Sequence, residues 1–307
     1  MFLLILMILI YIFTTLQISF RKWNATINKV MKKYPKNLLF FVLFVLVHLN
    51  YSCKRYDDLQ ELDVNSKDTI SQKDAESFDD KGFNYFPSST ENEIIAHNNY
   101  TLSYIEKYEQ AEWVAYELKK SELNYSNNNF ERPFFIEDPK VESGSADWRN
   151  YRKSGYDKGH LCPAGDRKFS KKAFDETFYT SNISPQRHDF NEGVWNRLEQ
   201  KVRYWAGKYD GIYVVTGGVF TDNMKTIGKE DVAVPNYFYK VLLDTSRDEL
   251  KMIAFLVPHE DSDLPLYEFV VSVDELEKMT GIDFYPKLDD GIENRLEQSA
   301  NYKSWSF

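Results

Sequence analysis

Three aromatic and β-branched runs in the second half of the chain constrain its fold more than any other feature. Each run is bounded by Gly, Pro or Asp, and the runs are IYVVTGGVF (212–220), YFYKVLLD (237–244) and KMIAFLVP (251–258). Such runs are typical of β-strands, and only TSRDEL separates the last two, which predicts an antiparallel pair. A fourth stretch, Trp113–Leu118, alternates with a period of two and predicts a further strand.

Two segments have the periodicity of helices. SVDELEKMTG (272–281) starts with acidic residues and stops at a glycine. NEGVWNRLEQKVRYWAG (191–207) stops at Gly207 and places four large apolar residues on one core-facing stripe: Val194, Leu198, Val202 and Trp205. Because the helices interrupt the strands at irregular intervals, we expect an α+β fold, with an antiparallel β-sheet flanked by helices, rather than a doubly wound parallel sheet.

The first 53 residues contain two apolar segments and no acidic residue. Residues 2–20 are about long enough to cross a bilayer. Met31 offers a second translation start. It is followed by the positively charged n-region and the apolar h-region of a signal peptide, which leads to Cys53. We interpret residues 1–53 as an export or lipoprotein signal region, with translation from Met31 and a lipid anchor at Cys53; ordinary cleavage and an uncleaved anchor are the alternatives. The protein would then be exported, as a cell envelope lipoprotein or a periplasmic or secreted protein.

The polar segment 54–98 separates this apolar start from the strand-rich part. Between Lys54 and Ile95 it holds eleven acidic and five basic residues. Such a segment cannot bury enough apolar surface to fold alone, so we interpret 54–98 as an acidic flexible tether and 99–307 as the folded domain. After Cys53 the chain carries 32 basic and 47 acidic side chains. This balance argues against a global basic clamp on a polyanion, so a nucleic-acid activity would need a local basic groove or a metal ion.

The chain has two cysteines, Cys53 and Cys162, which excludes a disulfide framework. Because Cys53 ends a hydrophobic segment, we expect the two thiols not to meet. Cys162 is then a lone thiol that packs as a small residue beside the motif described next.

The stretch GYDKGHLCPAGD (155–166) holds His160 among two carboxylates, a lysine and three glycines. Downstream, four residues recur at a spacing of four: Asn191, Trp195, Glu199 and Arg203. This spacing places them on one helix face, away from the apolar stripe. Each has an ordinary interpretation: the histidine is solvent-exposed or satisfied, the asparagine caps the helix, and the glutamate and arginine form an i,i+4 ion pair.

Taken together, these segments resemble the DNA/RNA non-specific endonucleases of the ββα-metal (His-Me finger) type. Asp157, Gly159 and His160 match the family's Asp-Arg-Gly-His motif. Lys158 replaces its arginine, which keeps the positive charge but loses the planar guanidinium that can form two parallel hydrogen bonds. Residues 181–186 match a family segment that resembles Ser-Asn-Ile-x-Pro-Gln.

The third motif of the family is an asparagine followed eight residues later by a glutamate, and Asn191 and Glu199 match it. The resemblance covers about residues 100 to 288. It implies that a ββα-metal motif is embedded in the α+β fold.

The resemblance assigns a role to each matched residue. His160 corresponds to the general base, Asn191 to the direct protein ligand of the metal, and Glu199 to a carboxylate that holds metal-bound water. Arg203 matches an arginine that stabilises charge on the phosphate, and Arg132 in ERPFFIEDP resembles the family's upstream arginine.

The implied activity is metal-dependent hydrolysis of DNA and RNA that leaves 5′-phosphate ends, with Mg²⁺ as the cofactor and Mn²⁺ as an alternative. An imidazole titrates near neutrality and can take a proton from water, and Mg²⁺ keeps several waters, so a single amide ligand is enough. Two other functions stay open: an envelope lipoprotein that binds nucleic acid without cleaving it, and a phosphodiesterase that acts on another substrate.

Overall fold

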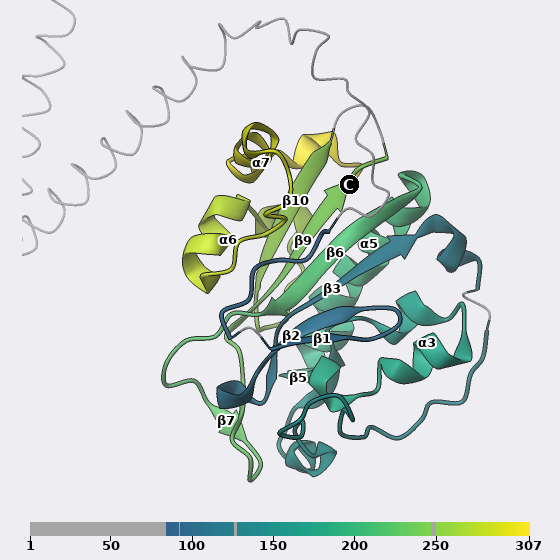
Figure 1. Cartoon of the computed structure of the whole chain (residues 1–307), viewed down its shortest axis with the longest axis vertical. Coiled ribbons are helices and arrows are strands. Elements are labelled where there is room, and N and C mark those ends of the chain that lie inside the picture. Colours follow the sequence, from purple (N-terminus) through teal and green to yellow (C-terminus); the bar gives the residue numbers. More distant parts are fainter. Residues whose placement is uncertain (1–83, 92, 126–127, 247–249) are drawn as a thin grey trace, which may run out of the picture. The chain divides into compact units, whose positions relative to one another are not determined.

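The structure is a computed structural model, and it describes residues 84–307 except residues 92, 126–127 and 247–249. Its largest element is a seven-stranded sheet (Figure 1) in which every neighbouring pair of strands is antiparallel. The strands in spatial order are β1 (Ile94–Ala96), β2 (Thr101–Ile105), β3 (Gln110–Lys119), β6 (Gly211–Gly218), β9 (Tyr237–Asp244), β10 (Lys251–Pro258) and β11 (Val270–Val271). The predicted α+β class, the four predicted strands and the antiparallel β9–β10 pair are therefore confirmed.

Two small two-stranded sheets and several short helices complete the described part. The small sheets are β4 (Asp157–His160) with β5 (Ile183–Gln186), and β7 (Thr226–Ile227) with β8 (Val232–Ala233). The α-helices are α3 (Lys171–Glu176), α4 (His188–Phe190), α5 (Asn196–Lys208), α6 (Val273–Thr280) and α7 (Asp290–Glu297), and η6 (Asn191–Trp195) is a π-helical turn. The 3₁₀ segments are η1 (Glu106–Tyr108), η2 (Lys120–Tyr125), η3 (Trp148–Tyr151), η4 (Ala164–Arg167), η5 (Thr180–Asn182), η7 (Leu266–Phe269) and η8 (Tyr302–Ser304).

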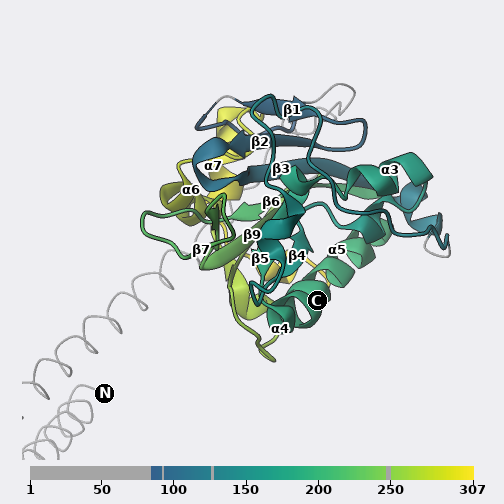
Figure 2. The same ribbon diagram turned by 90° about the horizontal axis from the view of Figure 1, so that it is seen from below.

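Helices cover both faces of the large sheet. The apolar stripe of α5 packs in the core on one face, whereas α6 and α7 belong to the core on the other (Figure 2). On β3, Val114 and Tyr116 point into the first core, and Trp113 and Ala115 point into the second. The period of two in this strand thus divides its side chains between two buried cores. Full burial of each large apolar side chain stabilises the folded state by about 1.5–3 kcal/mol.

Local signals set the ends of α6. At its start the Ser272 hydroxyl accepts a hydrogen bond from the Glu275 N–H at 3.2 Å, and at its end Gly281 has a φ of 73°. A serine N-cap and a left-handed glycine are the standard start and stop of a helix. The helix predicted at 272–281 is confirmed.

The sheet begins before the predicted domain boundary at residue 99. β1 lies within the segment that we expected to be tether, and Ile95 faces Leu102 of β2 in the antiparallel register. Further upstream, the Ser88 carbonyl accepts a hydrogen bond from the Trp113 indole N–H at 2.8 Å. The boundary at 99 is therefore too late, because long-range pairing orders a stretch whose composition alone would not fold.

The predictions for residues 1–53, including Met31 and Cys53, lie outside the described residues, as does the tether up to residue 83. Within the described ranges, no helix combines the length and apolar character that crossing a bilayer requires.

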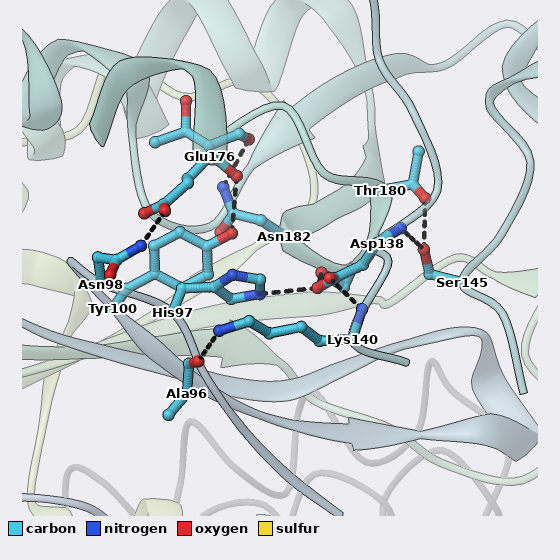
Figure 3. A network of polar contacts seen from close by, with 12 residues as sticks. Ala96, His97, Asn98, Tyr100, Asp138, Lys140, Ser145, Glu176, Thr180 and Asn182 are labelled. Atoms are coloured by element: carbon cyan, nitrogen blue, oxygen red, sulfur yellow. Dashed lines mark hydrogen bonds and ion pairs between the residues drawn. The ribbon is translucent and has the colours of Figure 1, made fainter. Parts of the chain in front are cut away.

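A buried polar network joins the turn between β1 and β2 to residues 138–145 and to η5 (Figure 3). The His97 Nε2 atom lies 2.8 Å from the Asp138 carboxylate, which also accepts a hydrogen bond from the Ser181 hydroxyl at 2.5 Å. The Ser145 hydroxyl bridges the Asp138 N–H and the Thr180 hydroxyl, at 2.7 and 2.8 Å. Burial raises the pKa of Asp138, but these hydrogen bonds outweigh burial and hold the pKa below its usual value.

Candidate active site

The β4–β5 pair carries the first two sequence motifs side by side. Asp157 faces Gln186 and His160 faces Ile183 in the antiparallel register. A Cβ atom at Gly159 would lie 2.1 Å from the side chain of the fully buried Gln186. Only glycine therefore allows Gln186 to pack across β4 at this point.

Gly159→Ala is expected to push the two strands apart and to lower the free energy of unfolding by about 1–3 kcal/mol, the usual cost of overpacking. Because His160 is the next residue, the rate of the hydrolysis implied by the sequence motifs should fall as well. Calorimetric melting and a cleavage assay would measure both effects. Gly207→Ala is the matched control, since its nearest neighbour beyond the helix is 3.5 Å away. Equal melting temperatures for the two variants would contradict the close packing.

Asn182 fixes the chain just beyond His160. Its Oδ1 atom accepts a hydrogen bond from the Cys162 N–H at 2.8 Å, and its Nδ2 group donates to the carbonyls of Cys162 and Thr177 at 3.0 and 2.9 Å. Cys162 is fully buried, as predicted, and burial raises the pKa of its thiol to about 12. The thiol is therefore a packing group and not a nucleophile.

The segment predicted as one helix at 191–207 is a π-helical turn followed by α5. Gly193 breaks the helical geometry with a φ of −89° and a ψ of −113°, and α5 continues one residue past Gly207. Trp195, which we expected on the polar face, is fully buried, with its ring centroid 5.6 Å from that of Phe238. The expectation of a polar face along the whole segment is wrong at Trp195, because this residue packs into the core beneath the sheet.

The π turn brings Asn191 against β4. Its Nδ2 group donates a hydrogen bond to Asp157 Oδ2 at 3.1 Å, and the same carboxylate oxygen lies 2.9 Å from Nδ1 of His188. Among the described residues, no hydrogen bond engages Oδ1 of Asn191. Asp157 thus orients the amide and leaves its oxygen as the atom that can bind a ligand.

The predicted site residues meet in one polar hollow of about 280 Å³. It is lined by Arg132, Lys158, His160, Pro163, Ala164, Gly165, Asn191, Glu199 and Arg203. Six of the eight predicted residues are in this lining, and the other two, Asp157 and Gly159, support it from β4. The structure therefore brings the predicted residues together, while their roles stay predictions.

His160 lies between aromatic rings. Its ring centroid is 5.0 Å from that of Phe178, in an edge-on arrangement, and 5.7 Å from that of Phe135. Nε2 is buried without a hydrogen-bond partner among the described residues. Burial, together with the positive charge of Arg132, lowers the pKa of His160 to about 3. The imidazole is therefore neutral throughout the neutral pH range, and in the free protein it is a weaker base than an exposed histidine.

Glu199 is the carboxylate of the hollow. Burial raises its pKa to about 7; the Lys240 cation opposes this shift and the Asp166 charge adds to it. Lys240 is itself fully buried on β9, with Nζ 3.1 Å from the Thr216 hydroxyl and 4.6 Å from the ring centroid of Trp195. Protonated and ionised Glu199 are therefore both well populated near pH 7.

We expect the hydrolysis implied by the sequence motifs to weaken as the pH falls through the pKa of Glu199, because protonation removes its negative charge from the hollow; this pKa is about 7 in the metal-free protein and lower with a cation bound nearby. His160 cannot cause this loss, since its pKa lies near 3 in the free protein. The measurement is kcat/KM against pH for the wild type, for Glu199→Gln and for Glu192→Gln as an exposed control on the preceding turn. The loss of activity on this acid side should disappear in Glu199→Gln only. The same loss in that variant would refute the assignment.

Arg203 is oriented by Asp166 more than by Glu199. Its Nη1 atom lies 2.7 Å from Asp166 Oδ1 and 3.9 Å from Glu199 Oε2. Asp166 is buried and also accepts a hydrogen bond from the Tyr116 hydroxyl at 2.9 Å. The i,i+4 pair considered from the sequence is therefore the longer of the two contacts, and a buried carboxylate aims the guanidinium.

The hollow gathers three cations. The Arg132 guanidinium lies 5.4 Å from the Phe178 ring centroid, and the Lys158 ammonium lies 5.2 Å from that of Phe135. Together with Arg203 they outnumber the single carboxylate in the lining. Such a concentration of positive charge favours an anionic ligand.

Sequence reasoning missed three residues that support the site: Asn182, Asp166 and Lys240. The first two stand inside the quoted motifs, but nothing in the sequence names their partners. Lys240 is the only charged residue in the strand run before Asp244, whose other residues are apolar or aromatic. A lone lysine in such a run could have indicated a buried charge with a partner.

Comparisons with known proteins agree with this geometry. Residues 82–291 match the profile of a family described as DNA/RNA non-specific endonuclease. The chain is 40% identical over 208 residues to the mitochondrial nuclease EXOG of Danio rerio, in an alignment that covers 62% of this chain and 60% of that protein. It is 32% identical over 209 residues to the mitochondrial endonuclease G of Homo sapiens, covering 64% of this chain and 70% of that protein.

A solved structure is similar as well. The crystal structure of the EndoG/EndoGI complex aligns with a TM-score of 0.60 and 31% identity, covering 64% of this chain and 86% of that chain. The chain thus spans about 60% of the length of the EXOG relative and most of the EndoG chain.

Proposed function

Because the chain belongs to the DNA/RNA non-specific endonuclease family, we propose that it hydrolyses phosphodiester bonds of DNA and RNA with His160 as the general base. The observation that carries this proposal is the polar hollow, where a neutral imidazole shares the lining with an amide, a carboxylate and three cations. Hydrolysis needs a base for the attacking water and fixed positive charge for the phosphoryl oxygens. The hollow contains both.

The family is metal-dependent, and the donor atoms in the hollow suit Mg²⁺ or Mn²⁺. Asn191 engages Asp157 through Nδ2, so its Oδ1 atom is available, and the Glu199 carboxylate has no contact closer than 3.9 Å with Arg203. Mg²⁺ prefers oxygen ligands and keeps several waters, so Asn191 would bind it directly and Glu199 would hold one of its waters. The bound ion would supply Lewis-acid stabilisation of the charge that develops on the phosphate.

The other residues act on water and phosphate. Because Nε2 of His160 is buried, Nδ1 is the nitrogen that takes the proton from the attacking water. A bound phosphodiester anion beside the ring favours the imidazolium and raises the pKa of His160 above its value in the free protein. Arg132, Lys158 and Arg203 hold the non-bridging oxygens, and Asp166 keeps Arg203 in position.

All the contacts proposed here address the phosphate, and none addresses a base edge. Phosphate contacts position a nucleic acid without reading its sequence, so cleavage should show little sequence preference. When water attacks the phosphorus, the P–O3′ bond breaks and the 3′ oxygen leaves and takes up a proton, so both DNA and RNA fragments carry 5′-phosphate and 3′-hydroxyl ends.

The test is to incubate the full chain with plasmid DNA and with RNA, in Mg²⁺ and in EDTA. A truncation at residue 99 is unsuitable, because it would remove β1. We expect cleavage of both polymers in Mg²⁺ and none in EDTA. Binding of both polymers without cleavage would favour the non-cleaving alternative, and hydrolysis of other phosphodiesters alone would favour another substrate.

We further propose that the domain is exported and anchored to the cell envelope through Cys53, on the strength of the apolar segments and the MKKYPKN start at Met31. A nuclease of this breadth held outside the cytoplasm is kept away from the cell's own nucleic acids. Mass spectrometry of the mature N-terminus tests the anchor. A lipid-modified Cys53 at the N-terminus is expected, and an unmodified Cys53 would exclude it.

A further inference from the structure

A second hollow, of about 510 Å³, opens next to the β7–β8 hairpin. It is bounded by residues 147–154 and 225–230, and we call it the basic groove. Five of its lining residues are basic (Arg149, Arg152, Lys153, Lys225 and Lys229), and two are acidic (Asp147 and Glu230). This local excess of positive charge stands in a chain whose net charge is −9.

A buried asparagine joins the two walls of the groove. Asn150 is 6% exposed, and its Oδ1 atom accepts hydrogen bonds from the Lys229 and Glu230 N–H groups at 2.8 and 3.3 Å. Its Nδ2 group donates to the Asp147 carbonyl at 2.7 Å and to the Glu230 carboxylate. Gly228, with a φ of 75°, allows this approach, since a Cβ there would lie 2.1 Å from Asn150. The groove is therefore built by buried contacts and does not depend on loose surface side chains.

The same contacts engage both acidic residues of the groove. The Asp147 carboxylate forms an ion pair with Arg149 at 2.5 Å, and the Glu230 carboxylate accepts a hydrogen bond from the Asp147 N–H at 2.8 Å. Within the described part of the chain, the four other basic side chains are exposed and form no ion pair with a carboxylate: Arg152, Lys153, Lys225 and Lys229. Their charges are available to an anion from solution.

The groove leads to the candidate active site along the chain. Lys225 Nζ lies 3.3 Å from the hydroxyl of Tyr156, the residue immediately before β4. Lys158, which lines the catalytic hollow, lies 6.0 Å from the ring centroid of Tyr151, in the wall segment of the groove. One short stretch of chain, 151–158, therefore connects the two sets of cations.

We propose that the basic groove binds the phosphodiester backbone of the nucleic acid on one side of the bond that is cleaved. The inference rests on the proposed function for the identity of the polymer. A repeating anion with one charge per nucleotide matches a group of basic side chains that form no ion pair, and DNA and RNA share this backbone chemistry. The groove is a local basic surface of the kind that an acidic nuclease needs.

The test measures binding and cleavage separately in the full chain. Binding of a fluorescent DNA duplex, and of an RNA of the same length, is followed by anisotropy in EDTA at several salt concentrations. Two paired variants remove groove charges, Lys225→Gln with Lys229→Gln and Arg152→Gln with Lys153→Gln. Lys278→Gln with Lys287→Gln is the matched control, because both lysines are exposed and lie outside the groove. Hydrolysis of bis(p-nitrophenyl) phosphate, which carries a single phosphodiester, reports on the catalytic hollow alone.

Each groove pair should weaken binding of both polymers, and should reduce the slope of log affinity against log salt by about 1 for each phosphate that the variant no longer neutralises. Hydrolysis of the small phosphodiester should be unchanged, and so should every property of the control pair. Unchanged affinity and slope in both groove pairs would overturn the proposal, as would an equal loss in the control pair. A wild type that binds through the groove but cleaves nothing would support the groove and overturn the nuclease function.

Discussion

Replacing His160 with alanine is expected to lower kcat/KM for DNA and RNA by about 10²- to 10⁴-fold, the usual contribution of a positioned general base. In the proposed mechanism His160 takes the proton from the attacking water, and its imidazole, with a pKa near 3 in the free protein, is unprotonated across the neutral range. The variant should still bind nucleic acid, because Arg132, Lys158 and Arg203 are untouched. Cleavage kinetics and binding in EDTA would measure the two properties.

His188→Ala is the control for His160→Ala. His188 is an exposed histidine whose Nδ1 atom lies 2.9 Å from the Asp157 carboxylate, and it does not line the hollow. Its removal should leave most of the activity. Comparable melting temperatures would show that the loss in His160→Ala is chemical and does not come from unfolding. Cleavage within tenfold of the wild type in a folded His160→Ala protein would exclude His160 as the base.

Replacing Asn191 with alanine is expected to lower cleavage at least about a hundredfold, because a metal ion contributes several kcal/mol to transition-state charge stabilisation. The variant loses the amide oxygen that Asp157 holds toward the hollow. It should therefore need a much higher Mg²⁺ concentration, and its affinity for Mn²⁺, measured by titration calorimetry, should fall in parallel. The measurement of metal affinity is independent of turnover.

Asn196→Ala is the matched control for Asn191→Ala, since Asn196 stands on the next turn and donates only a long hydrogen bond, 3.4 Å, to the Glu192 carbonyl. It should retain the metal dependence of the wild type. An Asn191→Ala protein that keeps the wild-type metal affinity would show that another residue binds the ion, and the assignment of Asn191 would be wrong.

The sequence by itself determined the features that depend on neighbouring residues. The strand runs at 237–244 and 251–258 predicted β9, β10 and their pairing. The short polar connection between them can join antiparallel neighbours but is too short for the crossover that a parallel pair needs. Ser272 and Gly281 marked the ends of α6, since capping is a local property of the backbone. The family resemblance, carried by the three motifs and extended to Arg132 and Arg203, also selected the six predicted site residues that line the hollow.

Only the tertiary structure decided the features that depend on distant partners. It placed β1 before residue 99, and it buried Trp195. It paired Arg203 with Asp166 and set Lys240 near Glu199, which no spacing in the chain predicts. The charge states in the hollow follow from these placements. Burial and long-range charge set a pKa, and both are properties of the packed protein that a residue's identity and its sequence neighbours do not contain.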